Sequence, residues 1–109
     1  MAKGYIVVRY TGPMHTPGAF EAWNEAAWKW FHEVAAPVYK KLGAVSWRVT
    51  ADWFGNTPRT VQMLEFDSVE QAVAAFASPE ATKLKEQFIA LGALDFSTTV
   101  HSLRREGKF

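Results

Sequence analysis

The hydrophobic period of this chain switches repeatedly between the strand and helix values, and the order of the switches constrains the fold most. Alternating or β-branched runs predict strands, whereas apolar residues that recur every three or four positions predict helices. Strand patterns occupy residues 3–10, 44–52, 59–67 and 94–105. Helical patterns occupy residues 20–42 and 68–91. The order β-α-β-β-α-β predicts an α+β, ferredoxin-like fold, with a four-stranded antiparallel sheet and both helices on one face.

Proline positions predict how the two helices begin and break. Pro37 lies inside the first helical pattern and has no N–H to donate, so we expect a kink or break near Ala36. The second pattern begins with Asp67 or Ser68 as its N-cap. It restarts at "SPE" (78–80), where serine caps a new helix and proline takes the first helical position.

Length and composition exclude several classes of function. A chain of 109 residues suits one domain, spanning residues 1–109. The net charge of +1 and the lack of a long basic run argue against nucleic-acid binding. No apolar stretch approaches the roughly 20 residues that span a bilayer, and the N-terminus has a strand pattern rather than that of a signal peptide. The absence of cysteine excludes disulfides and thiolate chemistry. A cytoplasmic location is the resulting expectation.

The first predicted strand has large apolar groups on both of its faces. Ile6 and Val8 lie on one face, and Tyr5 and Val7 lie on the other. Because both helices cover the same side of a ferredoxin-like sheet, the other side is left as an exposed apolar patch. Trp47 of the second strand adds to the apolar surface that must be covered. We therefore expect a homodimer that packs sheet face against sheet face with two-fold symmetry.

Asn24 is the most unusual residue of the first predicted helix, because it lies within the apolar stripe. A buried amide needs hydrogen-bond partners, which either the protein or a ligand supplies. In the first case Asn24 bonds a strand carbonyl or the Gly/Pro-rich loop at 11–18. In the second case it orients a ligand oxygen and stabilises a developing enolate. The sequence leaves both alternatives open.

Aromatic residues make up 15% of the chain, and five of them are tryptophans. Three of the candidate ligand contacts, Trp23, Trp28 and Phe31, belong to the first helix. Trp47 on the second strand and Phe76 on the second helix complete the set. Aromatic residues at helical spacing most often fill the core. The sequence leaves open whether these residues line a pocket, fill the core or lie at the dimer interface.

Two histidines are the candidate general bases. His15 lies in the loop before the first helix, and His101 lies on the last strand beside Thr99. Imidazole titrates near neutral pH and accepts a proton from a phenol or an activated methylene. Solvated surface positions are the alternative for both. The chain has no metal-ligand spacing, phosphate-binding loop or serine elbow, so we expect neither a metal nor an organic cofactor.

Two stretches, "AAPVYKKLGA" (35–44) and "MLEFDSVEQAVAAFASPEATKLKEQF" (63–88), resemble the dimeric α/β-barrel superfamily and, within it, a small functionally uncharacterised branch. The resemblance implies an apolar cavity between sheet and helices in each subunit. Members include cofactor-independent monooxygenases of phenolic polyketides or quinols, haem-degrading enzymes, polyketide cyclases and lactone isomerases. The haem-degrading members place an iron-ligating histidine where this chain has Thr82, so haem degradation is not expected.

Two hypotheses of different classes remain. In the first, the protein is an enzyme without a cofactor: a monooxygenase, cyclase or isomerase of a small apolar or aromatic substrate. Asn24 binds an oxygen in this hypothesis, and His15 or His101 is the base. In the second, the protein is a non-catalytic ligand-binding or structural homodimer. A cavity above roughly 300 Å³ near Asn24 favours ligand binding, because natural sites reach that size.

Overall fold

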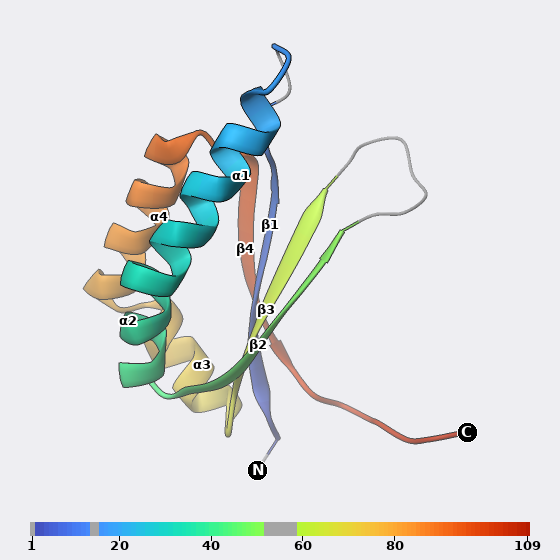
Figure 1. Cartoon of the computed structure of the whole chain (residues 1–109). Helices are drawn as coiled ribbons and strands as arrows, with labels where there is room; N and C mark the ends of the chain where they lie inside the picture. The colour runs from blue at the N-terminus through green and yellow to red at the C-terminus, as the bar shows by residue number, and fades with distance from the viewer. Residues whose placement is uncertain (1, 14–15, 52–58) are drawn as a thin grey trace.

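The computed structural model describes residues 2–13, 16–51 and 59–109 (Figure 1). The strands are β1 (Gly4–Thr11), β2 (Ala44–Ala51), β3 (Thr60–Phe66) and β4 (Leu94–Ser102). The helical segments are α1 (Ala19–Trp30), the π-helical turn η1 (Phe31–Ala35), α2 (Ala36–Lys41), α3 (Val69–Phe76) and α4 (Pro79–Leu91). None of these helices is long and apolar enough to cross a membrane.

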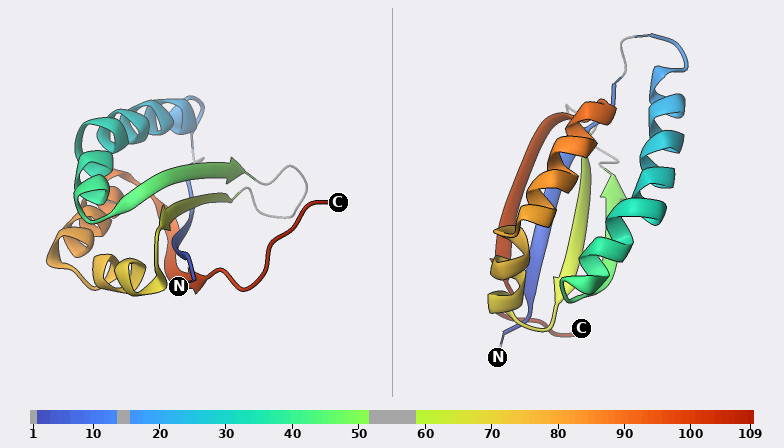
Figure 2. Two further views of the ribbon diagram at one scale, coloured as in Figure 1. Left: turned by 90° about the horizontal axis from the view of Figure 1, so that it is seen from below. Right: turned by 90° about the vertical axis from the view of Figure 1, so that its left-hand side faces the viewer.

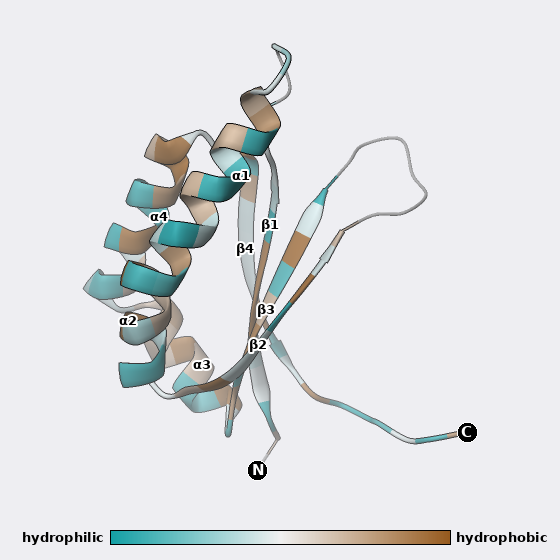
Figure 3. Cartoon of the chain, in the orientation of Figure 1, coloured by the Kyte–Doolittle hydropathy of each residue, from teal (hydrophilic) through white to brown (hydrophobic). Residues whose placement is uncertain are grey.

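The strands form one antiparallel sheet in the order β2-β3-β1-β4, with β1 and β3 at its centre. The helices all pack on one side of this sheet, and the other side is left open (Figures 1 and 2). Hydrophilic and hydrophobic residues alternate around α1 and α4, as expected for helices with one face on a sheet (Figure 3). The predicted ferredoxin-like β-α-β-β-α-β fold is thus confirmed.

The expected break near Ala36 takes the form of a π-helical turn. Pro37 cannot donate to the carbonyl of Glu33, so the α-helical ladder has to open just before it. The N–H of Ala36 instead donates to the carbonyl of Phe31, five residues earlier. The single helix predicted over 20–42 is therefore divided into α1, η1 and α2.

Two serines set the ends of α3 and α4. Ser68, rather than Asp67, caps α3, because its Oγ accepts a hydrogen bond of 3.2 Å from the N–H of Gln71. Ser78 caps α4 by accepting from the N–H of Ala81 at 3.2 Å. Its hydroxyl also donates to a carbonyl at the end of α3 at 2.6 Å, so the junction between the two helices is well bonded.

The strand register assigns each residue to the covered or the open face. Trp47 pairs with Leu64 and faces the helices, so it does not add to the open face. A shift in register between Ala44 and Ser46 is the cause, because it inserts Val45 as an extra residue. The open face mixes apolar, polar and charged residues, namely Tyr5, Val7, Arg9, Ser46, Arg48, Thr50, Val61, Met63, Glu65, Ser97, Thr99 and His101.

Candidate functional site

A small cavity of about 40 Å³ lies between the helices and the sheet, in the region around Asn24. Its wall is aromatic, built from Tyr10, Trp23, Trp28, Trp30, Phe31, Tyr39, Phe88 and Phe96. Asn24, Trp23, Trp28 and Phe31, which were candidates from the sequence, all line it. The helical stripe of α1 and its π turn thus bring four of the candidate residues to one place. We call this space the inner cavity.

The aromatic rings of the inner cavity hold one another in place. Trp30 stacks on Phe88 with ring centroids 5.4 Å apart and planes at 14°. Its indole N–H also donates to Oε1 of Gln87 at 3.0 Å, which fixes the orientation of the ring. Tyr10 meets the same Phe88 edge-on at 4.7 Å. Aromatic pairs in these geometries contribute about 0.5–1.5 kcal/mol beyond the area they bury, so this wall is pre-organised.

Two amide side chains line the inner cavity, Asn24 from α1 and Gln62 from β3. Gln62 is only 9% exposed and lies between Val8 and Val49 in the sheet. Within the ranges that the structure describes, neither amide side chain forms a hydrogen bond with the protein. Gln62 is largely buried and Asn24 is half-buried, and without a protein partner both groups are available to a ligand.

Two tyrosines supply further polar atoms to the inner cavity. Burial raises the pKa of Tyr10 to about 12, and burial likewise raises the pKa of Tyr39 to about 12. Both phenols therefore remain protonated at neutral pH and donate hydrogen bonds rather than accept protons. The described lining residues include no carboxylate and no imidazole, so this wall offers donors to a ligand but no general base.

A larger cavity of about 350 Å³ adjoins the inner one, beneath the junction of α3 and α4. The two cavities share Tyr39, Lys85 and Phe96. Phe76 lines this second space, which we call the outer cavity, and remains 44% exposed. The inner cavity alone falls short of the roughly 300 Å³ of natural sites, whereas the outer cavity reaches that size.

Trp47 lies behind the inner cavity rather than in its wall. Its ring centroid is 5.1 Å from that of Phe31 and 5.7 Å from that of Trp28. Together with Tyr39, Trp47 also lines a separate space of about 210 Å³ between α2 and β2. Trp47 therefore supports two ring residues of the inner cavity, and 46% of its surface is exposed.

The structure separates His101 from Asn24. His101 pairs with Tyr5 in the register of the sheet and lies on the open face, with its Nε2 2.8 Å from Oγ1 of Thr99. The inner cavity lies on the opposite, covered face, so one subunit does not bring this histidine to the amides. His15 lies outside the residues that the structure describes. In the described ranges, no three metal-binding side chains come together.

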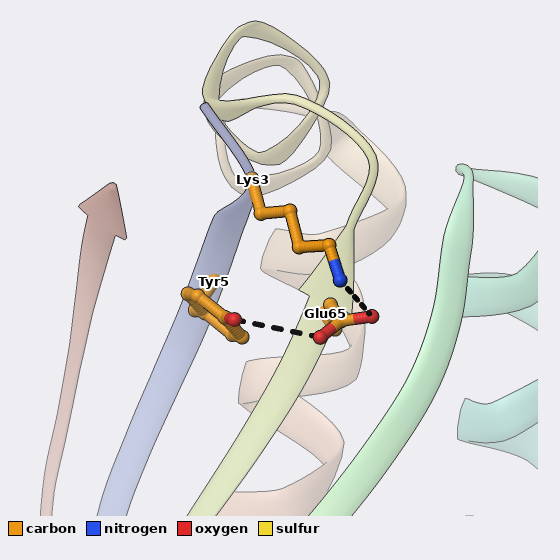
Figure 4. Close-up of polar contacts among 3 residues, drawn as sticks. All are labelled: Lys3, Tyr5 and Glu65. Atoms are coloured by element: carbon orange, nitrogen blue, oxygen red, sulfur yellow. Dashed lines mark hydrogen bonds and ion pairs between the residues drawn. The ribbon is translucent and has the colours of Figure 1, made fainter. Parts of the chain in front are cut away.

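The open face has a small polar cluster of its own (Figure 4). The hydroxyl of Tyr5 donates to Oε1 of Glu65 at 3.4 Å, and Nζ of Lys3 lies 3.9 Å from Oε2 of the same carboxylate. The carboxylate of Glu65 on β3 thus contacts Tyr5 of β1 and Lys3, which precedes β1. Such partly exposed contacts contribute little stability, and they define a charged end of the open face.

Four polar groups of the cavities, Tyr10, Tyr39, Gln62 and Lys85, were not among the candidates from the sequence. Gln62 does carry a signal, because it shares a strand face with Leu64 and Phe66, both fully buried apolar residues. A single amide on such a face resembles the situation of Asn24. Lys85 has no comparable signal, since a lysine on an amphipathic helix is ordinarily solvated.

The chain matches no protein-family model and no curated protein. Its structure is similar to that of a dimeric ferredoxin-like protein from an uncultured marine organism, with a TM-score of 0.69, 19% identity, and coverage of 98% of this chain and 100% of that one. A hydroxynitrile lyase from Passiflora edulis gives a TM-score of 0.67 at 10% identity, with 97% of both chains covered.

A cofactor-independent oxygenase from Streptomyces nogalater gives a TM-score of 0.62 at 15% identity, again with 97% of both chains covered. These similarities extend over almost the whole chain, and at such identities they establish the fold. The chain therefore has the same ferredoxin-like fold as these proteins, which is the fold that its sequence resemblance implied.

Proposed function

We propose that this protein binds a small aromatic molecule between its helices and its sheet. One observation carries the proposal: two amides without protein partners, Asn24 and Gln62, line an aromatic cavity that adjoins a space of about 350 Å³. The ring of the ligand occupies the outer cavity and packs against Phe96. One oxygen substituent enters the inner cavity, whose volume of about 40 Å³ accommodates a group the size of a water molecule, and bonds the amides.

A cofactor-independent oxygenation is the reaction that these groups support best. The described walls donate hydrogen bonds but hold no base, which disfavours cyclisation or isomerisation that begins with proton abstraction by the protein. A phenol that ionises by itself needs only donors for its oxygen and access for O₂. Similarity to the Streptomyces oxygenase supports this reaction, and similarity to the hydroxynitrile lyase supports a hydroxynitrile ligand instead. Binding without catalysis remains the alternative, because one fold hosts unrelated functions.

Replacing either amide with leucine tests the site. We expect Asn24→Leu and Gln62→Leu each to weaken binding of the fluorescent probe 2-naphthol about tenfold, because a hydrogen bond to its hydroxyl is lost. We also expect the melting temperature of Gln62→Leu to rise by a few degrees, since this change replaces a largely buried amide that has no protein partner. Fluorescence titration and thermal unfolding measure the two effects.

Gln71→Leu is the matched control for this experiment. Gln71 makes the same amide-to-leucine change on an exposed position of α3, and its side chain lines neither cavity. It is expected to leave probe affinity unchanged. If Asn24→Leu and Gln62→Leu both remain folded and keep the wild-type affinity for the probe, the amides do not contact a ligand.

We also propose that two copies of the chain pair through their open sheet faces. The helices cover only one side of the sheet, and Tyr5 and Met63 on the other side are half-buried within a single chain. The similar marine protein is itself dimeric, which supports this arrangement. In such a dimer, the polar cluster around Glu65 and the pair formed by Thr99 and His101 lie at the interface.

A charge at the centre of the open face is expected to separate the dimer. Met63 pairs with Val7 and Arg48, so Met63→Arg places an additional cation beside Arg48 in the proposed interface. Native mass spectrometry at micromolar concentration is expected to give a dimer for the wild type and a monomer for Met63→Arg. Ile89→Arg, which adds the same charge to an exposed position of α4, should remain dimeric. A monomeric wild type would contradict the proposal.

A further inference from the structure

We propose that the ligand of the two cavities is an aromatic anion whose ionised oxygen contacts the ammonium group of Lys85. This inference rests on the proposed function and narrows the class of ligand. Lys85 lines both the inner and the outer cavity, so its charge lies where the two spaces meet. A phenolate and an aromatic carboxylate share the required chemistry, a planar ring with a charged oxygen.

The charge of the cavity walls has one sign. Among the described residues that line the inner and outer cavities, Lys85 is the only charged side chain. The neighbouring space between α2 and β2, which shares Tyr39 with both cavities, is lined by one charged residue, Lys40. Neither β1 nor β4 contributes a charged side chain to these walls, and among the described lining residues no carboxylate faces Lys85 across them. Lys85 is itself exposed, so solvent weakens its attraction for an anion, but the single positive sign of the walls still favours a bound anion over a neutral ligand.

The side chain of Lys85 is directed toward the sheet. Its Nζ lies 5.8 Å from the ring centroid of Phe96 on β4, within the range of a cation–π contact. In the part of the chain that the structure describes, the ion pair found is between Lys3 and Glu65, and Lys85 takes part in none. Its ammonium group is therefore held over the aromatic wall with its charge uncompensated by a protein carboxylate.

Neighbouring donors complete the recognition of an anion. The phenol of Tyr39 lines both cavities and stays protonated at neutral pH, because burial raises its pKa to about 12. Thr82, one turn before Lys85 on α4, also lines the outer cavity, but its hydroxyl donates to the carbonyl of Ser78 at 3.4 Å, so the amides of Asn24 and Gln62 are the other neutral donors of these walls. A cation with neutral donors around it stabilises an oxyanion, whereas an acidic wall would repel it.

Titration of bound para-nitrophenol tests the inference directly, because its phenolate and phenol absorb at different wavelengths. We expect the phenolate to bind wild-type protein about tenfold more tightly than the phenol, which lowers the pKa of the bound probe by about one unit. Lys85→Met is expected to abolish this shift, and Lys85→Arg to retain it. Lys83→Met, at an exposed position of the same helix that lines neither cavity, should behave as the wild type.

Two further probes distinguish the outcomes. The neutral para-nitroanisole should bind wild type and Lys85→Met equally, since it has no ionisable oxygen. Para-nitrobenzoate tests the carboxylate form: a tenfold loss in Lys85→Met identifies aromatic carboxylates as ligands, and a loss confined to nitrophenolate identifies phenolates. If nitroanisole binds but the pKa of bound nitrophenol equals that of the free probe, the inference is overturned and the proposed function stands. If none of the probes binds, the proposed function is overturned together with the inference.

Discussion

Replacing Gly4 with alanine is expected to destabilise the folded protein strongly. A Cβ atom at this position would lie 2.5 Å from Cα of Val69, 2.7 Å from the carbonyl oxygen of Ser68 and 2.9 Å from Cβ of Ala72. Two of these atoms belong to the backbone at the start of α3, so no side-chain rotation relieves the clash. We expect a loss of about 3 kcal/mol or more in the free energy of unfolding, measured by urea denaturation.

Gly107→Ala provides the control for the Gly4 variant. Its added Cβ would meet no atom within 4 Å, so the free energy of unfolding should stay close to that of the wild type. The close approach at Gly4 exists because the N–H of Val69 donates to the carbonyl of Ala2 at 3.0 Å. This bond holds the first turn of α3 close to β1. A Gly4→Ala protein of wild-type stability would show that α3 and β1 are farther apart.

The second large effect is a loss of stability at alkaline pH. In the folded protein, burial raises the pKa of Tyr10 and that of Tyr39 to about 12, from the ordinary tyrosine value of 10.0. Above pH 10 the unfolded chain ionises both phenols while the folded chain does not, so the folded state loses relative stability. By pH 11 the free energy of unfolding falls by about 1.4 kcal/mol for each tyrosine, and by about 3 kcal/mol for the pair. Below pH 10 this stability is fully present, and it is lost as the pH rises toward 12.

Urea denaturation at pH 9 and pH 11 measures this effect. Tyr39→Phe removes one ionisable phenol and should reduce the loss between the two pH values by about half, whatever its effect on stability at pH 9. Tyr5→Phe is the control, since Tyr5 lies on the open face rather than in the cavity wall. An equal loss at pH 11 in Tyr39→Phe and the wild type would show that Tyr39 ionises as readily in the folded chain as in the unfolded one.

The order of the elements was predictable from the sequence because each pattern is local. The β-branched run of β1, the stripe of α1 and the Ser78-Pro79 start of α4 each depend on residues close together in the chain. Even the interruption near Ala36 followed from Pro37. Its form as a π turn did not, because an opened ladder can be closed in more than one way and the packing of Phe31 and Ala35 decides between them.

The candidate site was predictable only where one helix carries it. Asn24 and Trp23 lie on the stripe of α1, so their common direction is a property of the sequence. Gln62 and Lys85 join them through long-range packing of β3 and α4, which no local pattern specifies. The face on which His101 lies depended on the register between β1 and β4, and that register is set by the complete sheet.

The π turn allows the chain to carry one residue more than an α-helix of the same overall rotation. Tyr39 follows the turn and lines all three spaces between helices and sheet. Successive residues of an α-helix are separated by about 100° of rotation, and the wider π turn takes up about that angle because its hydrogen bond spans five residues instead of four. Removing one residue from 31–35 would therefore leave α2, and the phenol of Tyr39, facing the same wall. Removing Val38, which follows the turn, would instead rotate Tyr39 by about 100° away from the wall shared by the inner and outer cavities. The two deletions together offer a way to change which ligands the site accepts while the sheet, and the face it presents to a partner, stays intact.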